Sequence, residues 1–158
     1  MENIKRIDEK TIEVDGIVYK AEKKDDKIQH GFEKYSRYWC ILGGKVCEGM
    51  WIDGDEDEKR LSIGNAFHTK KEAEFALEKL KVIHELKQFA EPKNTVWDFN
   101  ECHYFFYYDY TSDEIVYGCS AIMKLPGITF ATEEMARKAV ETVGKDRIKK
   151  YYLEVEES

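Results

Sequence analysis

No stretch of this 158-residue chain approaches the roughly 20 consecutive apolar residues that a membrane-spanning helix needs. Its first residues, MENIKRIDEK, carry charges but are not followed by the apolar segment that is typical of a secretory signal peptide. We therefore expect a cytoplasmic protein that does not interact with a membrane.

The common signatures of catalysis are also missing. The sequence has no GxxxxGK[ST] phosphate-binding loop, no GxGxxG motif after a predicted strand and no HExxH metalloprotease motif. Its histidines do not show the spacing of a zinc site, and no cysteine lies in a nucleophile motif. We therefore expect no catalytic residue, no metal and no cofactor, and we predict that the protein is not an enzyme.

The cysteines show no CxxC spacing and no secretory disulfide framework around them. These cysteines are Cys40, Cys47, Cys102 and Cys119. We expect all of them to be reduced and most of them to face the core.

Positive charge is in deficit. The chain has 25 Lys and Arg residues against 32 Asp and Glu residues, which gives a net charge of −7. Nucleic-acid binding depends on Lys and Arg displacing counterions from phosphates, so nonspecific DNA binding is disfavoured. The same charge balance favours a partner that has a basic surface.

An internal repeat is the most informative pattern that the chain contains. Much of the sequence that begins at residue 64 returns at residue 127, an offset of 63. The matched pairs are Gly64 and Gly127, Phe67 and Phe130, Thr69 and Thr132, and Ala73 and Ala136. We expect Thr69 and Thr132 to start two helices, and Phe67 and Phe130 to fill equivalent core positions.

Each repeat is predicted to contain a β-hairpin, a third strand and a helix. In the first, the strands are expected at residues 35–42, 46–51 and 61–67, with a loop at 53–58 and a helix from Thr69 to about residue 90. In the second, they are expected at 101–110, 115–117 and 128–130, followed by a helix from Thr132 to Gly144 and a short helix at 146–152. Asp15-Gly16 indicates the turn of a further hairpin near the N-terminus.

These elements predict an α+β fold made of two tandem β-hairpin–strand–helix repeats with pseudo-two-fold symmetry. The expected parts are an N-terminal hairpin and connector at 1–34, repeat one at 35–94 and repeat two at 95–158. We expect the repeats to pack as one domain, and two separate domains are the alternative.

Two groups of side chains are candidates for binding a partner. Spaced carboxylates in the loop 53–58 and in the second hairpin can resemble a phosphate backbone, or simply keep the surface soluble: Asp53, Asp55, Glu56, Asp57, Glu58, Asp109, Asp113 and Glu114. Aromatic side chains in the strands can stack on unpaired bases, or belong to the core: Tyr38, Trp39, Tyr104, Phe106 and Tyr108.

Three segments carry a resemblance to a known group of proteins: GNAFHTKKEAEFALEKLKVIHELKQFA at 64–90, HYFFYYDY at 103–110 and ITFATEEMARKAVETVGKDRIKKYY at 128–152. Together they resemble small accessory proteins of bacteriophages and prophages of Gram-positive bacteria, over residues 35–155. Related sequences often have Ser within the segment 131–134, a difference that leaves the helix cap intact.

Members of that group are mostly of unassigned function, so the resemblance supplies no catalytic residues. It implies a phage-encoded binding protein in the host bacterial cytoplasm. The expected function is inhibition of a host defence system, of the anti-CRISPR or anti-restriction type, through an acidic and DNA-mimicking surface that meets a basic host protein. The alternative is a nucleic-acid-binding accessory protein that uses the aromatic hairpin.

Overall fold

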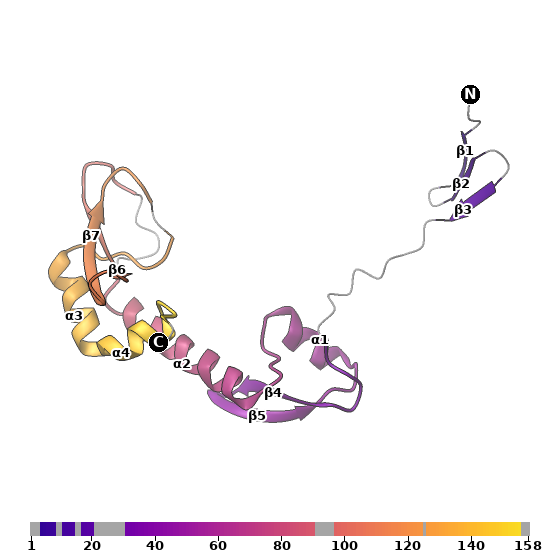
Figure 1. Cartoon of the computed structure of the whole chain (residues 1–158), viewed down its shortest axis with the longest axis horizontal. Helices are drawn as coiled ribbons and strands as arrows, with labels where there is room; N and C mark the ends of the chain where they lie inside the picture. The colour runs from indigo at the N-terminus through magenta and orange to yellow at the C-terminus, as the bar shows by residue number, and fades with distance from the viewer. Residues whose placement is uncertain are drawn as a thin grey trace. The chain divides into compact units, whose positions relative to one another are not determined.

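A computed structural model describes residues 4–8, 11–14, 17–20, 31–90, 97–124 and 126–155. The chain forms two compact units, Met1–Gly31 and Phe32–Ser158 (Figure 1). The predicted division between residues 94 and 95 falls in 91–96, which lies outside the described residues, as does most of the predicted connector, at 21–30. Each unit is described by itself below.

The N-terminal unit is a three-stranded antiparallel sheet in the order β1-β2-β3. The strands are β1 (Ile4–Asp8), β2 (Thr11–Val14) and β3 (Ile17–Lys20). The pairing of β2 with β3 confirms the predicted hairpin, although its turn at Asp15-Gly16 lies outside the described residues. Strand β1 was not predicted, because the two apolar residues of its sequence, IKRID, are three positions apart and show no alternation.

The second unit begins with a predicted hairpin, formed by β4 (Arg37–Leu42) and β5 (Lys45–Met50). Gly43 and Gly44 both have positive φ, at 56° and 74°, as a tight two-residue hairpin turn requires. The register places Cys40 opposite Cys47.

A short helix, α1 (Asp55–Ser62), replaces most of the predicted loop at 53–58 and the first two residues of the predicted strand at 61–67. The acidic residues fill the first turn of this helix, and two basic residues fill its last turn. Both placements are favourable, because acidic side chains stabilise the N-terminal end of the helix dipole and basic side chains its C-terminal end. The acidic segment predicted to be a solvated loop therefore forms the start of a helix. Only Phe67 of the predicted strand pairs, through reciprocal backbone hydrogen bonds with Trp39.

The long helix α2 (Lys70–Lys87) starts at the predicted cap. The Thr69 hydroxyl accepts a hydrogen bond from the Glu72 N–H at 3.2 Å, and the Glu72 carboxylate accepts one from the Thr69 N–H at 3.0 Å. This reciprocal pair confirms the capping box. Helix α2 contacts β4 and β5 as well as the two C-terminal helices, so it joins both halves of the unit.

The second hairpin and the remaining helices follow the prediction closely. They are β6 (His103–Asp109), β7 (Glu114–Ser120), α3 (Glu133–Val143) and α4 (Lys145–Tyr151). The Thr132 hydroxyl caps α3 by accepting a hydrogen bond from the Met135 N–H at 3.1 Å. The predicted strand at 128–130 is reduced to one bridge, in which Phe130 pairs with Tyr104.

The hairpins β4-β5 and β6-β7 form separate two-stranded sheets, and each has its own core. The smaller core consists of Tyr38, Cys40 and Trp51. The larger core combines the second half of α2 with α3, α4, Phe106 and Phe130. The fold is therefore α+β. The expectation of equivalent phenylalanines is wrong in one respect, since Phe130 is fully buried whereas Phe67 is only half-buried.

Salt bridges hold α4 to α2 at the larger core. The Arg147 guanidinium donates to both oxygens of Glu85, at 2.8 and 3.0 Å, and lies 3.7 Å from Glu78. The Phe75 and Tyr151 rings pack beside this ion pair, with centroids 5.2 Å apart. A two-point arginine–carboxylate pair fixes orientation as well as distance.

Replacing Thr69 with Ala removes the cap of α2. We expect the substitution to cost about 1 kcal/mol of unfolding free energy, because the Glu72 N–H loses its acceptor. Urea denaturation followed by circular dichroism measures this cost, and Thr69→Ser is the matched control that keeps the hydroxyl. If Thr69→Ala abolished partner binding without lowering the melting temperature, the structural role of this cap would be wrong.

Candidate functional site

The exposed carboxylates in α1 and just before it form the candidate binding surface, which we call the α1 acidic surface: Asp53, Asp55, Glu56 and Glu58. Glu56 accepts a hydrogen bond from the Lys59 ammonium at 3.0 Å, and this bond lowers the pKa of Glu56. All four side chains come from one short segment, so the α1 acidic surface is a dense patch of negative charge that one nearby lysine partly offsets.

Asp57, the fifth predicted acidic residue of this segment, lies inside the protein, with 4% of its surface exposed. One of its oxygens accepts from the Tyr38 hydroxyl at 2.9 Å. The other accepts from the backbone N–H of Ile52 at 2.9 Å and, more weakly, from that of Gly54 at 3.4 Å. Asp57 therefore ties the start of α1 to the hairpin below it and is not available to a partner.

Arg60 completes this buried network. Its guanidinium donates to the Tyr38 hydroxyl at 2.5 Å and lies 3.9 Å from Asp57. Burial alone raises the pKa of Asp57, but the hydrogen bonds from Ile52, Tyr38 and Gly54 and the charge of Arg60 outweigh it, so the pKa lies below its usual value. The carboxylate is thus ionised at neutral pH, and its charge is balanced within the fold.

The Asp53 side chain is exposed, but it also makes a structural hydrogen bond. Its carboxylate accepts a hydrogen bond from the indole N–H of the buried Trp51 at 2.6 Å. Its backbone has φ of 57°, a left-handed conformation in which Asp is more common than most residues. The side chains of Asp55, Glu56 and Glu58 are consequently the exposed carboxylates of a helix whose start is held in place by hydrogen bonds.

The remaining predicted acidic residues belong to the turn between β6 and β7. Asp109 accepts from the Thr111 N–H at 2.8 Å, and this bond lowers its pKa. Asp113 accepts from the Tyr108 hydroxyl and from the Lys149 ammonium, which lies 3.5 Å away, while Glu114 is exposed. The hydrogen bond to Asp113 raises the pKa of Tyr108 to about 12. These carboxylates thus form a second group, with partners of their own in the second hairpin and in α4.

Most of the predicted stacking residues face inward. Tyr38 is fully buried and Phe106 is 7% exposed. Trp39, Tyr104 and Tyr108 are half-buried, and the Tyr108 hydroxyl is occupied by Asp113. Because side chains alternate along a strand, the opposite face of β6 carries Phe105 and Tyr107 instead. Tyr107 is 46% exposed, and Tyr110 in the adjoining turn is 78% exposed.

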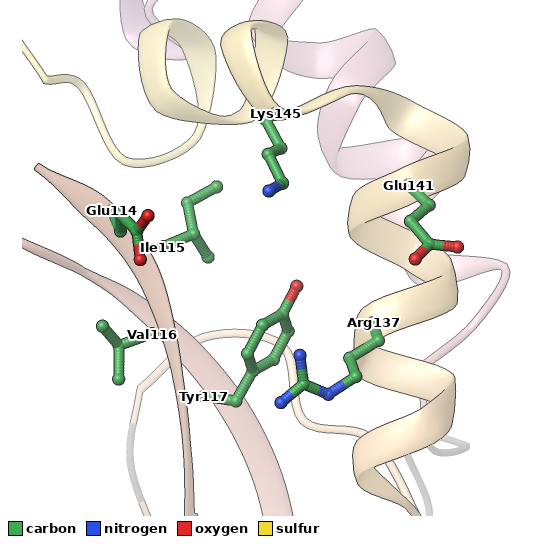
Figure 2. A pocket seen from close by; sticks show the side chains of 7 residues that line it. All are labelled: Glu114, Ile115, Val116, Tyr117, Arg137, Glu141 and Lys145. Carbon is green, nitrogen blue, oxygen red and sulfur yellow. The ribbon is translucent and has the colours of Figure 1, made fainter.

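A charged pocket of about 400 Å³ lies between β7, α3 and the start of α4. Figure 2 shows the Tyr117 hydroxyl and the Lys145 ammonium pointing into the same space, with the Arg137 guanidinium beside the Tyr117 ring. The guanidinium carbon is 4.3 Å from the ring centre. Glu114 and Glu141 also line the pocket, so positive and negative groups are nearly balanced. Burial raises the pKa of Tyr117, which keeps this hydroxyl protonated as a hydrogen-bond donor.

A second pocket, of about 440 Å³, lies between β4 and α2 and is mostly apolar. Ile41, Ile63, Phe67, Leu80 and Ile83 contribute its apolar side chains. The prediction that Phe67 is a core residue missed this pocket. The order of the elements could have indicated this difference, because Phe130 precedes two helices of the larger core, α3 and α4, whereas among the described residues Phe67 precedes only α2 before the next strand.

The cysteines divide into two kinds. Cys40 is buried and Cys47 half-buried, whereas Cys102 and Cys119 are exposed. The prediction that most cysteines face the core is therefore wrong for the second hairpin, where both lie near the strand ends. Within the described part of the chain, no three His, Cys, Asp or Glu side chains gather into a metal-binding group. None of the helices described there combines the length and apolar character needed to cross a membrane.

Replacing Asp57 with Asn separates the structural carboxylate from the exposed ones. We expect Asp57→Asn to lower the unfolding free energy by about 1–3 kcal/mol, because buried donors lose their charged acceptor. Glu58→Gln is the matched control on the same helix, and we expect it to cost less than about 1 kcal/mol. Urea titration of both variants measures the difference, and equal costs would contradict the buried network.

The same carboxylate predicts a pH dependence. The pKa of Asp57 is lower in the folded state than the unfolded value of about 3.9. Its stabilising contribution is therefore complete above that pH and is lost as the pH falls through the folded-state pKa. The difference in unfolding free energy between the wild type and Asp57→Asn, measured between neutral pH and about pH 3, should narrow once the pH falls below about 3.9. A constant gap across this range would contradict the assignment.

Comparison of the chain with protein-family models, with curated protein sequences and with solved structures gives no match. Function is therefore argued from the chemistry of the surfaces and pockets. The α1 acidic surface offers fixed negative charge to a basic partner, and the second hairpin offers the exposed aromatic rings of Tyr107 and Tyr110.

Proposed function

We propose that this chain is a non-catalytic binding protein of a bacteriophage or prophage, which acts in the cytoplasm of a Gram-positive host. Its function is to inhibit a host defence system of the anti-CRISPR or anti-restriction type. The observation that carries this proposal is the contrast within α1, where Asp57 is buried and anchored while Asp55, Glu56 and Glu58 are exposed.

Anchoring matters because ordering mobile side chains and loops on binding reduces affinity. Here the Tyr38–Asp57–Arg60 network holds the helix that carries the exposed carboxylates before any partner arrives. A basic groove that normally binds nucleic acid would find on these preorganised carboxylates the negative charge that phosphates carry. Such complementarity speeds association and gives specificity, and it weakens as salt screens the charges.

We also propose that the second unit consists of two tandem repeats related by pseudo-two-fold symmetry. In support, each hairpin is bridged by a later phenylalanine, Phe67 to Trp39 and Phe130 to Tyr104. Gly64 and Gly127, three residues before each phenylalanine, both have positive φ. Each bridge is followed by a threonine-capped helix.

The main difference between the proposed repeats points to the binding surface. Helix α1 lies between β5 and the Phe67 bridge, whereas the corresponding segment between β7 and the Phe130 bridge contains no helix in its described residues. A scaffold that is shared by both repeats accounts for stability. The insertion of a charged helix into one of them is what we expect binding to use.

A nucleic-acid-binding accessory protein remains the second candidate. It is favoured by two exposed rings, that of Tyr107 near the end of β6 and that of Tyr110 in the turn that follows. Exposed aromatic rings of this kind stack on unpaired bases. The net charge of −7 weighs against it, since phosphate binding requires positive charge.

Affinity purification of the tagged full chain from phage-infected cells tests the proposal directly. We expect a host protein with a basic surface to copurify and the complex to weaken as the salt concentration rises. The variant Asp55→Asn/Glu56→Gln/Glu58→Gln should bind this partner at least about tenfold more weakly, equivalent to about 1.4 kcal/mol.

The control variant carries the same change of charge at exposed positions elsewhere, Glu101→Gln/Glu134→Gln/Asp146→Asn. We expect it to bind as the wild type does, which separates the α1 acidic surface from net charge alone. Unchanged affinity in the α1 variant would overturn the proposed surface. Copurification of nucleic acid instead of protein would favour the second candidate.

A further inference from the structure

The exposed thiols of Cys102 and Cys119 meet at one end of the second hairpin. Their sulfur atoms are 3.0 Å apart. We propose that these two cysteines are a modification site, at which a reversible intramolecular disulfide forms by exchange with a low-molecular-weight disulfide such as oxidised glutathione. This chemistry is independent of the α1 acidic surface.

Strand register explains why the two thiols meet. Tyr104 on β6 pairs with Cys119 on β7, and side chains alternate along each strand. Cys102 precedes Tyr104 by two residues, so it extends the same face and is the diagonal neighbour of Cys119. A disulfide has an S–S distance of about 2.05 Å, so the sulfurs need to approach by only about 1 Å.

The ends of both strands are held in place around this pair. The ring of His103, which follows Cys102, stacks on Trp97 with centroids 3.7 Å apart. The Trp97 indole donates to the backbone carbonyl of Ala121 at 2.7 Å, two residues after Cys119. On the other edge of β6, away from β7, Tyr104 is bridged to Phe130 by backbone hydrogen bonds. The encounter of the thiols is therefore supported by packing on both strands.

The exchange proceeds in two balanced steps. In one order of attack, the Cys102 thiolate attacks one sulfur of glutathione disulfide, which forms a mixed disulfide and releases one glutathione thiolate that takes up a proton. The Cys119 thiol then loses its proton and attacks the Cys102 sulfur, which forms the protein disulfide and releases the second glutathione. In total, two protein thiols lose two protons and two electrons, and the glutathione disulfide gains them.

Either thiol can make the first attack, with the other as the resolving thiol, because both are exposed to the disulfide reagent.

The first hairpin contains a natural comparison. Cys40 and Cys47 are direct partners across β4 and β5, but Cys40 is buried with 3% of its surface exposed. Exchange needs access of the disulfide reagent to a thiolate. In the native protein, we therefore expect the exposed pair to oxidise and the buried pair to stay reduced.

Equilibration of the full chain in glutathione buffers of increasing oxidised fraction tests the proposal. Free thiols are trapped with iodoacetamide, and the protein is digested and mapped by non-reducing mass spectrometry. We expect a peptide pair linked through Cys102 and Cys119, which dithiothreitol separates again. The oxidised protein should melt roughly 5–10 °C higher, because the link closes a loop of the second hairpin.

Single substitutions make the result specific. Cys102→Ser and Cys119→Ser should each abolish the linked peptide and the rise in melting temperature, while Cys47→Ser should leave both unchanged. Because the two substituted thiols are exposed, these variants are expected to fold. Separate glutathione adducts on Cys102 and Cys119 without a linked peptide would overturn the proposal, as would a link between Cys40 and Cys47 in its place.

Discussion

The buried carboxylate of Asp57 organises the first half of the second unit. Taking a charged group out of water is costly unless hydrogen bonds and an opposite charge replace the solvent. Tyr38, Arg60 and the N–H groups after β5 provide this replacement. The same contacts fix α1 on the β4-β5 hairpin, which has a small apolar core of its own. The polar network and the core therefore depend on each other, because Tyr38 belongs to both.

Helix α2 extends this constraint to the rest of the unit. It begins at the Thr69 capping box, contacts the first hairpin and packs against α3 and α4 through Val82 and Leu86. The helix thus contributes to the larger core and also contacts the first hairpin, and the pairing of Arg147 with Glu85 fixes how α4 meets it.

Three surface features of the second unit differ in their chemistry. The α1 acidic surface presents fixed carboxylates, the pocket beside Tyr117 balances cations against anions, and the far end of the second hairpin brings two thiols together. The α1 acidic surface lies on a scaffold in which the buried carboxylate of Asp57 has its hydrogen-bond partners within the protein. Binding to a partner through α1 and oxidation at the second hairpin use different parts of that scaffold.

Local rules in the sequence determined the hairpin turn at Gly43-Gly44, the threonine-capped starts of α2 and α3, and hence the α+β class, since such signals act within a few residues. Only tertiary structure decided that the acidic run forms α1 and that Asp57 is internal, because Tyr38 lies 19 residues away in the chain. It also decided the different burial of Phe67 and Phe130 and the meeting of Cys102 with Cys119. These outcomes depend on strand register and on which element covers which face, and no short stretch of sequence contains that information.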